Sequence, residues 1–169
     1  MTLPPWPGWD GLHPLVIHFP IALLMVAPLF VLLSLVLRRY AIEFSRTALV
    51  LLALGTLATY VAVSTGKAAG ELAEHNDAIN AVISQHEELA ETTRNAFTVL
   101  TLLYAMFTLG PGPLRRLRRP ALALVTNAVF LVALAGASLL VVSTAHQGGR
   151  LVHQLGVHAM MPVAPAAER

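Results

Sequence analysis

Four long apolar stretches limit what this sequence can fold into, and they lie at 15–37, 47–65, 91–110 and 121–145. The hydrocarbon core of a bilayer is crossed by about 20 helical residues, so the first, second and fourth stretches are long enough to span it. The third is apolar only from Asn95 onwards. A helix that begins near Asp77 and enters the membrane near Arg94 would supply the missing length. We therefore predict one domain over 1–169, an all-α integral membrane four-helix bundle.

The composition excludes several classes of protein. Hydrophobic residues make up 56% of the chain and charged residues 12%, whereas soluble domains contain about 45–50% and about 25%. A water-soluble core could not bury so much apolar surface, so the lipid bilayer is the expected partner. Without cysteine the chain alone cannot form disulfides, attach c-type haem covalently or hold an iron–sulfur cluster. The small net charge gives no argument for nucleic-acid binding.

Charged residues are sorted by side. Seven of the eleven Lys and Arg residues lie in two short loops, at 38–46 and 115–119, which contain one of the nine acidic residues, Glu43. Membrane proteins keep such arginine-rich loops in the cytoplasm. The charge pattern therefore predicts that both termini lie outside, and this asymmetry suits a bacterial inner (cytoplasmic) membrane with the termini on the periplasmic side.

A weak internal repeat relates the ends of two helices. Residues 61–72 align without gaps to residues 140–151, and both segments end a helix that runs outwards. One interpretation is that the bundle consists of two repeated helix hairpins of the same topology. The alternative is that the ends of membrane helices share a small set of residue types.

All seven histidines fall on the predicted outer side, at positions 13, 18, 75, 86, 146, 153 and 158. Imidazole is a common metal ligand and the axial ligand of many haems, and a helix bundle can present ligands from facing helices into its core. The histidine cluster therefore predicts a cofactor site near the outer membrane face.

His18 is the first candidate ligand, because it lies just inside an apolar span where an unpaired polar ring is costly. We expect it to face the bundle core and to ligate together with His86 or His146, with His13 as a further candidate. Five residues separate His13 from His18, which places them about 140° apart on a helix, so a regular helix would not direct both to one metal.

The remaining histidines have a weaker claim. His75, His153 and His158 are interpreted first as interfacial side chains bonded to water, carbonyls or carboxylates, and only then as ligands. Gly148 and Gly149 are expected to end the last helix, because paired glycines are unfavourable in a helix.

Other chemistry has little support in the sequence. No zinc-protease, nucleophile-elbow, P-loop or dinucleotide fingerprint occurs. The spans contain no acidic or basic residue at mid-depth, which counts against an ion-coupled transporter. Polar residues within the spans, such as Thr56, Thr101, Tyr104 and Asn127, are expected to form hydrogen bonds between helices.

Four segments of the chain form a recognisable pattern. They are the run LHPLVIHFPIAL from Leu12 to Leu23, Thr65–Gly70, the His86 region and a terminal GGRLV at 148–152. In these segments the chain resembles a bacterial family of small membrane proteins catalogued as domain of unknown function 2231, over nearly its whole length. The resemblance implies that the protein works with electron-transfer partners, since relatives are sometimes fused to Rieske or cytochrome-like modules. His153 stands where the family pattern has tyrosine and His158 where it has glycine, which leaves His13, His18, His86 and His146 as the better candidates.

The leading hypothesis is a small membrane electron-transfer protein that binds b-type haem through histidines and exchanges electrons with a Rieske or cytochrome-type partner on the outer side. Such a protein is an electron carrier rather than an enzyme by itself. One alternative is a cofactor-free accessory subunit of a larger membrane complex. Another is a non-haem site for copper, zinc or iron, with imidazole and carboxylate ligands.

Overall fold

The computed structural model describes residues 7–110 and 119–157. Four long helices carry most of these residues, preceded by a short one, and two single 3-10 turns, η1 (Asp10–Leu12) and η2 (Arg38–Tyr40), lie beside them. The helices are α1 (His13–Val16), α2 (His18–Val36), α3 (Ala41–Glu71), α4 (Asp77–Leu109) and α5 (Pro120–His153). No strand occurs within the described residues, and the predicted all-α fold class is confirmed.

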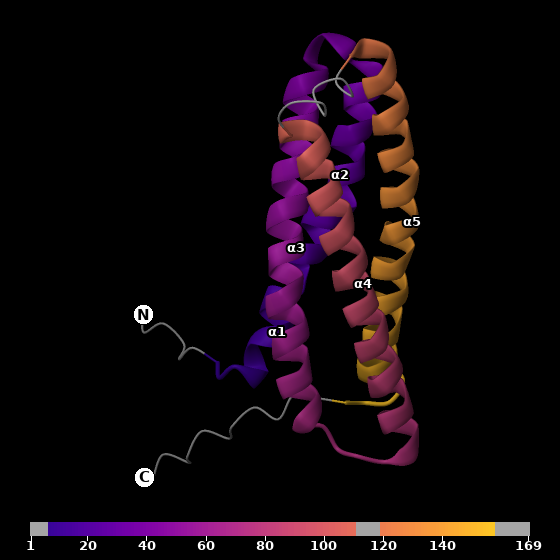
Figure 1. Ribbon diagram of the computed structural model, residues 1–169. Helices are drawn as coiled ribbons and strands as arrows, with labels where there is room; N and C mark the ends of the chain where they lie inside the picture. Colours follow the sequence, from indigo (N-terminus) through magenta and orange to yellow (C-terminus); the bar gives the residue numbers. More distant parts are fainter. Residues whose placement is uncertain (1–6, 111–118, 158–169) are drawn as a thin grey trace.

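The long helices run up and down in sequence order around the bundle (Figure 1). Each packs against its neighbours in the chain, and α5 closes the ring against α2. Within the described residues, the backbones of the diagonal pairs α2–α4 and α3–α5 do not approach each other closely. We call the end with Arg38, Arg39 and Arg119 the arginine end and the end with His13 and His86 the histidine end. Both the first and the last described segments lie at the histidine end (Figure 1).

Prolines and a capping asparagine explain where the helices begin. Pro14 occupies the first turn of α1, and Pro20 near the start of α2 has no N–H to donate. A turn at Ile17 separates the two helices. The side chain of Asn76 accepts the Ile79 N–H at 2.9 Å, which caps α4 and confirms its predicted start at Asp77.

The prediction that Gly148 and Gly149 end the last helix is wrong. Helix α5 continues through both glycines to His153, and the chain turns instead at Gly156, which has a φ of 65°. The N–H of Val157 then bonds the carbonyl of Leu151 at 2.9 Å, as in a glycine-terminated helix end. Contacts with α4 outweigh the poor helix propensity of the two glycines.

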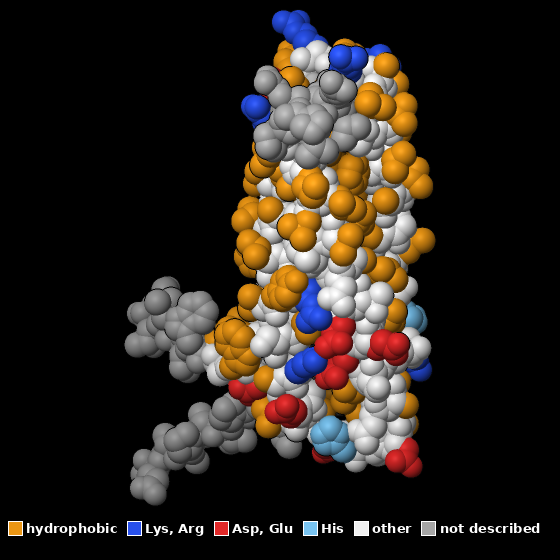
Figure 2. Space-filling view, in the orientation of Figure 1, with side chains coloured by type: hydrophobic (Ala, Val, Ile, Leu, Met, Phe, Trp, Pro, Cys, Tyr) orange, Lys and Arg blue, Asp and Glu red, His pale blue; other side chains and the backbone are white. Residues whose placement is uncertain are grey.

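Three helical segments are long and apolar enough to cross a membrane among the described residues, Asp10–Val36, Arg38–Glu71 and Pro120–His153. Helix α4 is of similar length, but its first half is polar and its apolar part begins at Asn95. Hydrophobic side chains cover the shaft of the bundle, and charged side chains gather lower down over α3 and α4 (Figure 2). The chain is therefore a membrane protein that contacts lipid along its shaft.

Side chains fill the bundle toward the arginine end. Tyr104 is fully buried, its ring centroid lies 4.9 Å from that of Phe130, and its hydroxyl donates to Oδ1 of Asn127 at 3.0 Å. Between α3 and α4, the hydroxyls of Thr56 and Thr101 lie 2.9 Å apart. The prediction that these polar residues bond between helices is confirmed.

Candidate functional site: two imidazoles at one cavity

His13 is held at the histidine end by the main chain of α3. Its Nδ1 lies 3.0 Å from the carbonyl oxygen of Ala62 and 3.3 Å from Oγ1 of Thr65. A carbonyl oxygen can only accept, so Nδ1 carries the proton and donates it. The neutral ring then keeps an unshared electron pair on Nε2, which can accept a hydrogen bond or bind a metal.

His86 repeats this arrangement between α4 and α5. Its Nδ1–H donates to the carbonyl oxygen of Thr144 at 3.0 Å. Burial of the half-exposed ring lowers the pKa of His86 below its ordinary value, which favours the neutral form. This second imidazole therefore also presents the electron pair of Nε2.

A glycine stands four residues beyond each acceptor. A Cβ on Gly66 would lie 2.8 Å from Cε1 of His13, and one on Gly148 would lie 3.2 Å from Cε1 of His86. The carbonyl of a helical residue points toward the residue four positions later. A side chain there would block the imidazole, so Gly66 and Gly148 open the carbonyls of Ala62 and Thr144 to it.

Both imidazoles line one cavity of about 450 Å³ at the histidine end. Ligand and cofactor sites in proteins commonly occupy roughly 300–1,000 Å³. All four long helices and α1 contribute to its wall, which is mainly apolar and rich in small residues. Besides the two imidazoles, the polar wall residues include Asp10, Thr59, Lys67, Glu87, Thr93, Thr144 and His153.

A family model described as predicted membrane protein (DUF2231) matches residues 10–161. The chain belongs to the DUF2231 family. The match covers α1 to α5 and both imidazoles of the cavity, and it confirms the resemblance seen in the sequence. No curated protein and no solved structure matches the chain.

In this DUF2231 protein, the expectation that His18 faces the bundle core is wrong. His18 is exposed, its Nδ1–H donates to the carbonyl of Pro14 at 2.9 Å, and it does not line the cavity. The predicted angle between His13 and His18 explains the outcome, because only one of two residues so far apart around a helix can face inwards. His13 takes that place.

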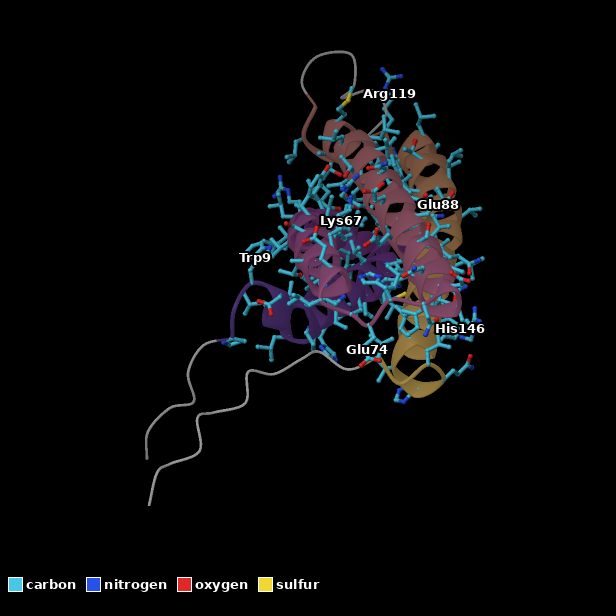
Figure 3. The ribbon with its side chains drawn as sticks, turned by 90° about the horizontal axis from the view of Figure 1, so that it is seen from below. Trp9, Lys67, Glu74, Glu88, Arg119 and His146 are labelled. Atoms are coloured by element: carbon cyan, nitrogen blue, oxygen red, sulfur yellow. The ribbon has the colours of Figure 1, made fainter. Side chains whose placement is uncertain are left out.

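The other described histidines are more exposed than these two partly buried imidazoles. His146 is exposed at the periphery of the bundle (Figure 3). His75 precedes α4 and its Nδ1 lies 2.7 Å from Oδ1 of Asn80. His153 is exposed and contributes to the cavity wall. His158 lies outside the described residues.

The structure brings together two of the four main candidates, His13 and His86. Over the part of the chain that the structure describes, no group of three or more His, Cys, Asp or Glu side chains is placed to hold a metal ion. The site of this DUF2231 protein is therefore a pair of imidazoles in an apolar cavity.

Sequence reasoning missed the glycines and the main-chain acceptors. In the sequence alone, Gly66 has no predicted role in the site, and Gly148 is expected to end the last helix. The two acceptors, Ala62 and Thr144, lie 82 positions apart, whereas the internal repeat pairs residues 79 positions apart. The repeat therefore marks related helix ends but gives the wrong register for the site.

Proposed function

We propose that this protein is a small membrane electron-transfer protein that holds b-type haem in the cavity at the histidine end, with His13 and His86 as the axial ligands. One observation carries the proposal. Two imidazoles that lie 73 positions apart in the chain line the same cavity. Each has its Nδ1–H bonded to a main-chain carbonyl, and Nε2 has no partner among the described residues.

The ligand set favours haem over a bare metal ion. Protein sites for zinc normally supply three or four ligands, and the described residues offer no group of three. Two imidazoles leave such a site incomplete. They are a complete axial set for haem, because the porphyrin supplies the other four iron ligands.

The cavity wall also suits a flat, mainly apolar group. Gly66 and Gly70 on α3 and Gly148 and Gly149 on α5 all line it, so the backbones of two helices form part of the surface. Small residues let a planar ligand approach closely, while the apolar remainder of the wall suits the hydrophobic faces of such a ligand. Cavities with these properties bind cofactors in many helical bundles.

Bound haem would supply one-electron chemistry, and the chain would control its surroundings. His13 and His86 would occupy both axial positions, which favours electron transfer over the binding of oxygen. The carbonyls of Ala62 and Thr144 would hold each ring in one tautomer and orientation and raise the basicity of Nε2.

The orientation of the bundle belongs to the same proposal. We place the arginine end in the cytoplasm and the histidine end outside a bacterial inner membrane, because Arg38, Arg39 and Arg119 cluster at one end. Helix α4 packs between α3 and α5 over its length and would form the fourth crossing. The cavity then lies near the outer water boundary, within reach of a soluble or tethered redox domain.

The visible absorption spectrum of the detergent-purified protein, expressed with ample haem, tests the proposal. We expect the sharp reduced bands of a low-spin b-type haem after dithionite reduction. His13→Ala and His86→Ala should abolish or strongly shift these bands, whereas His18→Ala and His146→Ala should leave them unchanged. A featureless wild-type spectrum would reject the haem proposal and favour a cofactor-free subunit of a larger membrane complex.

A further inference from the structure

Lys67 carries a positive charge at the wall of the cavity. It follows Gly66 on α3 and, among the described wall residues, it is the only Lys or Arg. Figure 3 views the bundle from the histidine end and shows Lys67 where α3 and α4 face each other. A ligand in the cavity that reaches this part of the wall meets the side chain of Lys67.

The present partner of Lys67 lies outside the cavity wall. Its Nζ is 2.6 Å from Oε1 of Glu91 on α4, and the two side chains are 50% and 40% exposed. Exposed ion pairs contribute little to stability, so exchange of Lys67 to another carboxylate costs little. Arg94 also acts electrostatically on Glu91 and would continue to offset its charge after such an exchange.

The other charged wall residues repel anions. Asp10 and Glu87 line the cavity, and the Glu87 carboxylate lies against α3, with Oε1 3.4 Å from the position that a Cβ on Gly70 would take. Glu87 also acts electrostatically on Lys67, so this acid lies near the lysine and partly offsets its charge. An anionic group of a ligand would therefore be disfavoured near Asp10 and would find its one cationic partner of the described wall in Lys67.

We propose that Lys67 binds a propionate carboxylate of the haem and exchanges from Glu91 to do so. The inference rests on the proposed function and names the group that orients the cofactor. Lys67 acts as a positioning residue, because it contacts the edge of the ligand and leaves the axial positions to His13 and His86. In the absence of haem, Lys67 pairs with Glu91, and it exchanges to the propionate when haem binds.

The test compares haem with haem dimethyl ester, in which both carboxylates are neutral. Affinities of the purified, haem-free protein in detergent are measured by absorption titration with each compound. Because a charge-assisted hydrogen bond strengthens binding appreciably, we expect wild-type protein to bind haem about tenfold more tightly than the ester. Lys67→Met should remove this preference and keep the wild-type affinity for the ester, which also reports that the variant is folded.

Glu91→Gln separates the proposed role from a structural one. Removal of the competing carboxylate frees the Lys67 ammonium, so haem affinity should rise about two- to threefold, with no change for the ester. A purely structural ion pair would instead give parallel losses for both compounds in Lys67→Met and Glu91→Gln. Arg150→Met is the matched control, because Arg150 is a cation on α5 near the same end that does not line the cavity.

The outcomes distinguish this inference from the proposed function. If wild-type protein binds neither compound, the haem proposal fails. Equal affinity of wild-type protein for haem and the ester overturns the role of Lys67 and leaves the haem proposal intact. A preference for haem that persists in Lys67→Met also overturns it.

Discussion

The arginine half and the histidine half of the bundle use the same helices in different ways. Toward the arginine end, Tyr104, Phe107 and Phe130 fill the interior, with ring centroids 4.9–6.0 Å apart. Toward the histidine end, glycines replace large side chains, and the helices enclose a cavity of about 450 Å³. One half therefore stabilises the bundle by packing, and the other keeps space for a ligand.

Polar groups follow the same division. In the packed half, side chains pair with each other between adjacent helices, as Tyr104 does with Asn127, or bond carbonyls of their own helix, as Ser34 does with Val31. In the open half the two imidazoles bond main-chain carbonyls, and one nitrogen of each ring is left for another partner. Substitutions should therefore affect stability most in the first half and ligand binding most in the second.

Tyr104→Ala should have the largest effect on stability. The side chain is fully buried, and truncation of a large buried aromatic ring costs about 3–5 kcal/mol. Unfolding in detergent, followed by circular dichroism, measures the loss. Leu139→Ala is the control, since Leu139 is 68% exposed and should change the free energy of unfolding by roughly 0.5 kcal/mol or less. Equal losses in the two variants would contradict a packed arginine half.

Gly66→Ala should have the next largest effect, and it acts on ligand binding. The new Cβ would approach Cε1 of His13 to 2.8 Å, which would displace the ring from the carbonyl of Ala62 and lower haem affinity by about tenfold, equivalent to one hydrogen bond. Gly148→Ala should have a smaller effect, because its Cβ would lie 3.2 Å from Cε1 of His86. Absorption titration measures both.

Gly149→Ala provides the control for this series. A Cβ on Gly149 meets nothing within 4 Å, and alanine in a helix is about 0.5–1 kcal/mol more favourable than glycine. This variant should keep the wild-type affinity and gain stability. If Gly66→Ala and Gly149→Ala bind haem equally well, the glycine contact is not required for the site.

A change of pH should have a moderate effect on the free energy of unfolding, through His86 at the histidine end. Burial lowers the pKa of His86 below 6.5, opposed in part by the hydrogen bond to Thr144 and the charge of Glu87. The unfolded chain therefore binds the proton more tightly than the folded protein. Stability from His86 is fully present above about pH 6.5 and declines as the pH falls toward the folded-state pKa, by at most about 1.4 kcal/mol per pH unit.

Unfolding of haem-free protein between pH 5 and 7.5 measures this decline. His86→Gln should flatten the profile in this range relative to wild type, because the variant has no proton to gain at that position. Haem affinity of the wild type should fall over the same range, since a proton competes for Nε2. Identical pH profiles for wild type and His86→Gln would show that His86 is charged or exposed in the folded protein.

The smallest effect is expected for His18→Ala. The ring is exposed and bonds a carbonyl of its own helical segment, so removal should change the free energy of unfolding by roughly 0.5 kcal/mol or less and leave the haem spectrum unaltered. A lost spectrum in His18→Ala with an intact one in His13→Ala would reverse our assignment of the ligands.

Residues close together in the chain predicted the fold well. Apolar stretches predicted the long helices, and the polar residues before Asn95 predicted a helix that begins near Asp77, because these features act within a few residues. The extension of α5 past Gly148 was not predictable in this way. It depends on packing against α4, which a local pattern does not contain.

The site was only half predictable. The sequence correctly placed the described histidines at one end and predicted that His13 and His18 point in different directions on a regular helix. Its candidate His86 lines the cavity, and its role as a ligand stays a prediction. The sequence could not decide which of His13 and His18 faces inwards, because that depends on contacts of His13 with Ala62 and Gly66, about 50 positions away. The spacing of two residues within one helix predicts the angle between the directions of their side chains. Packing against the neighbouring helix determines which of the two side chains faces the interior of the bundle.

The use of carbonyls as hydrogen-bond acceptors has a consequence for how this site tolerates change. Every residue type supplies a carbonyl at positions 62 and 144, so substitution there leaves the acceptor in place. Glycine is needed instead at positions 66 and 148, because a larger residue there would block the imidazole from the carbonyl. Variants that keep the imidazole pair should therefore keep the glycines at 66 and 148, whereas positions 62 and 144 can vary, because only their carbonyls bond the rings.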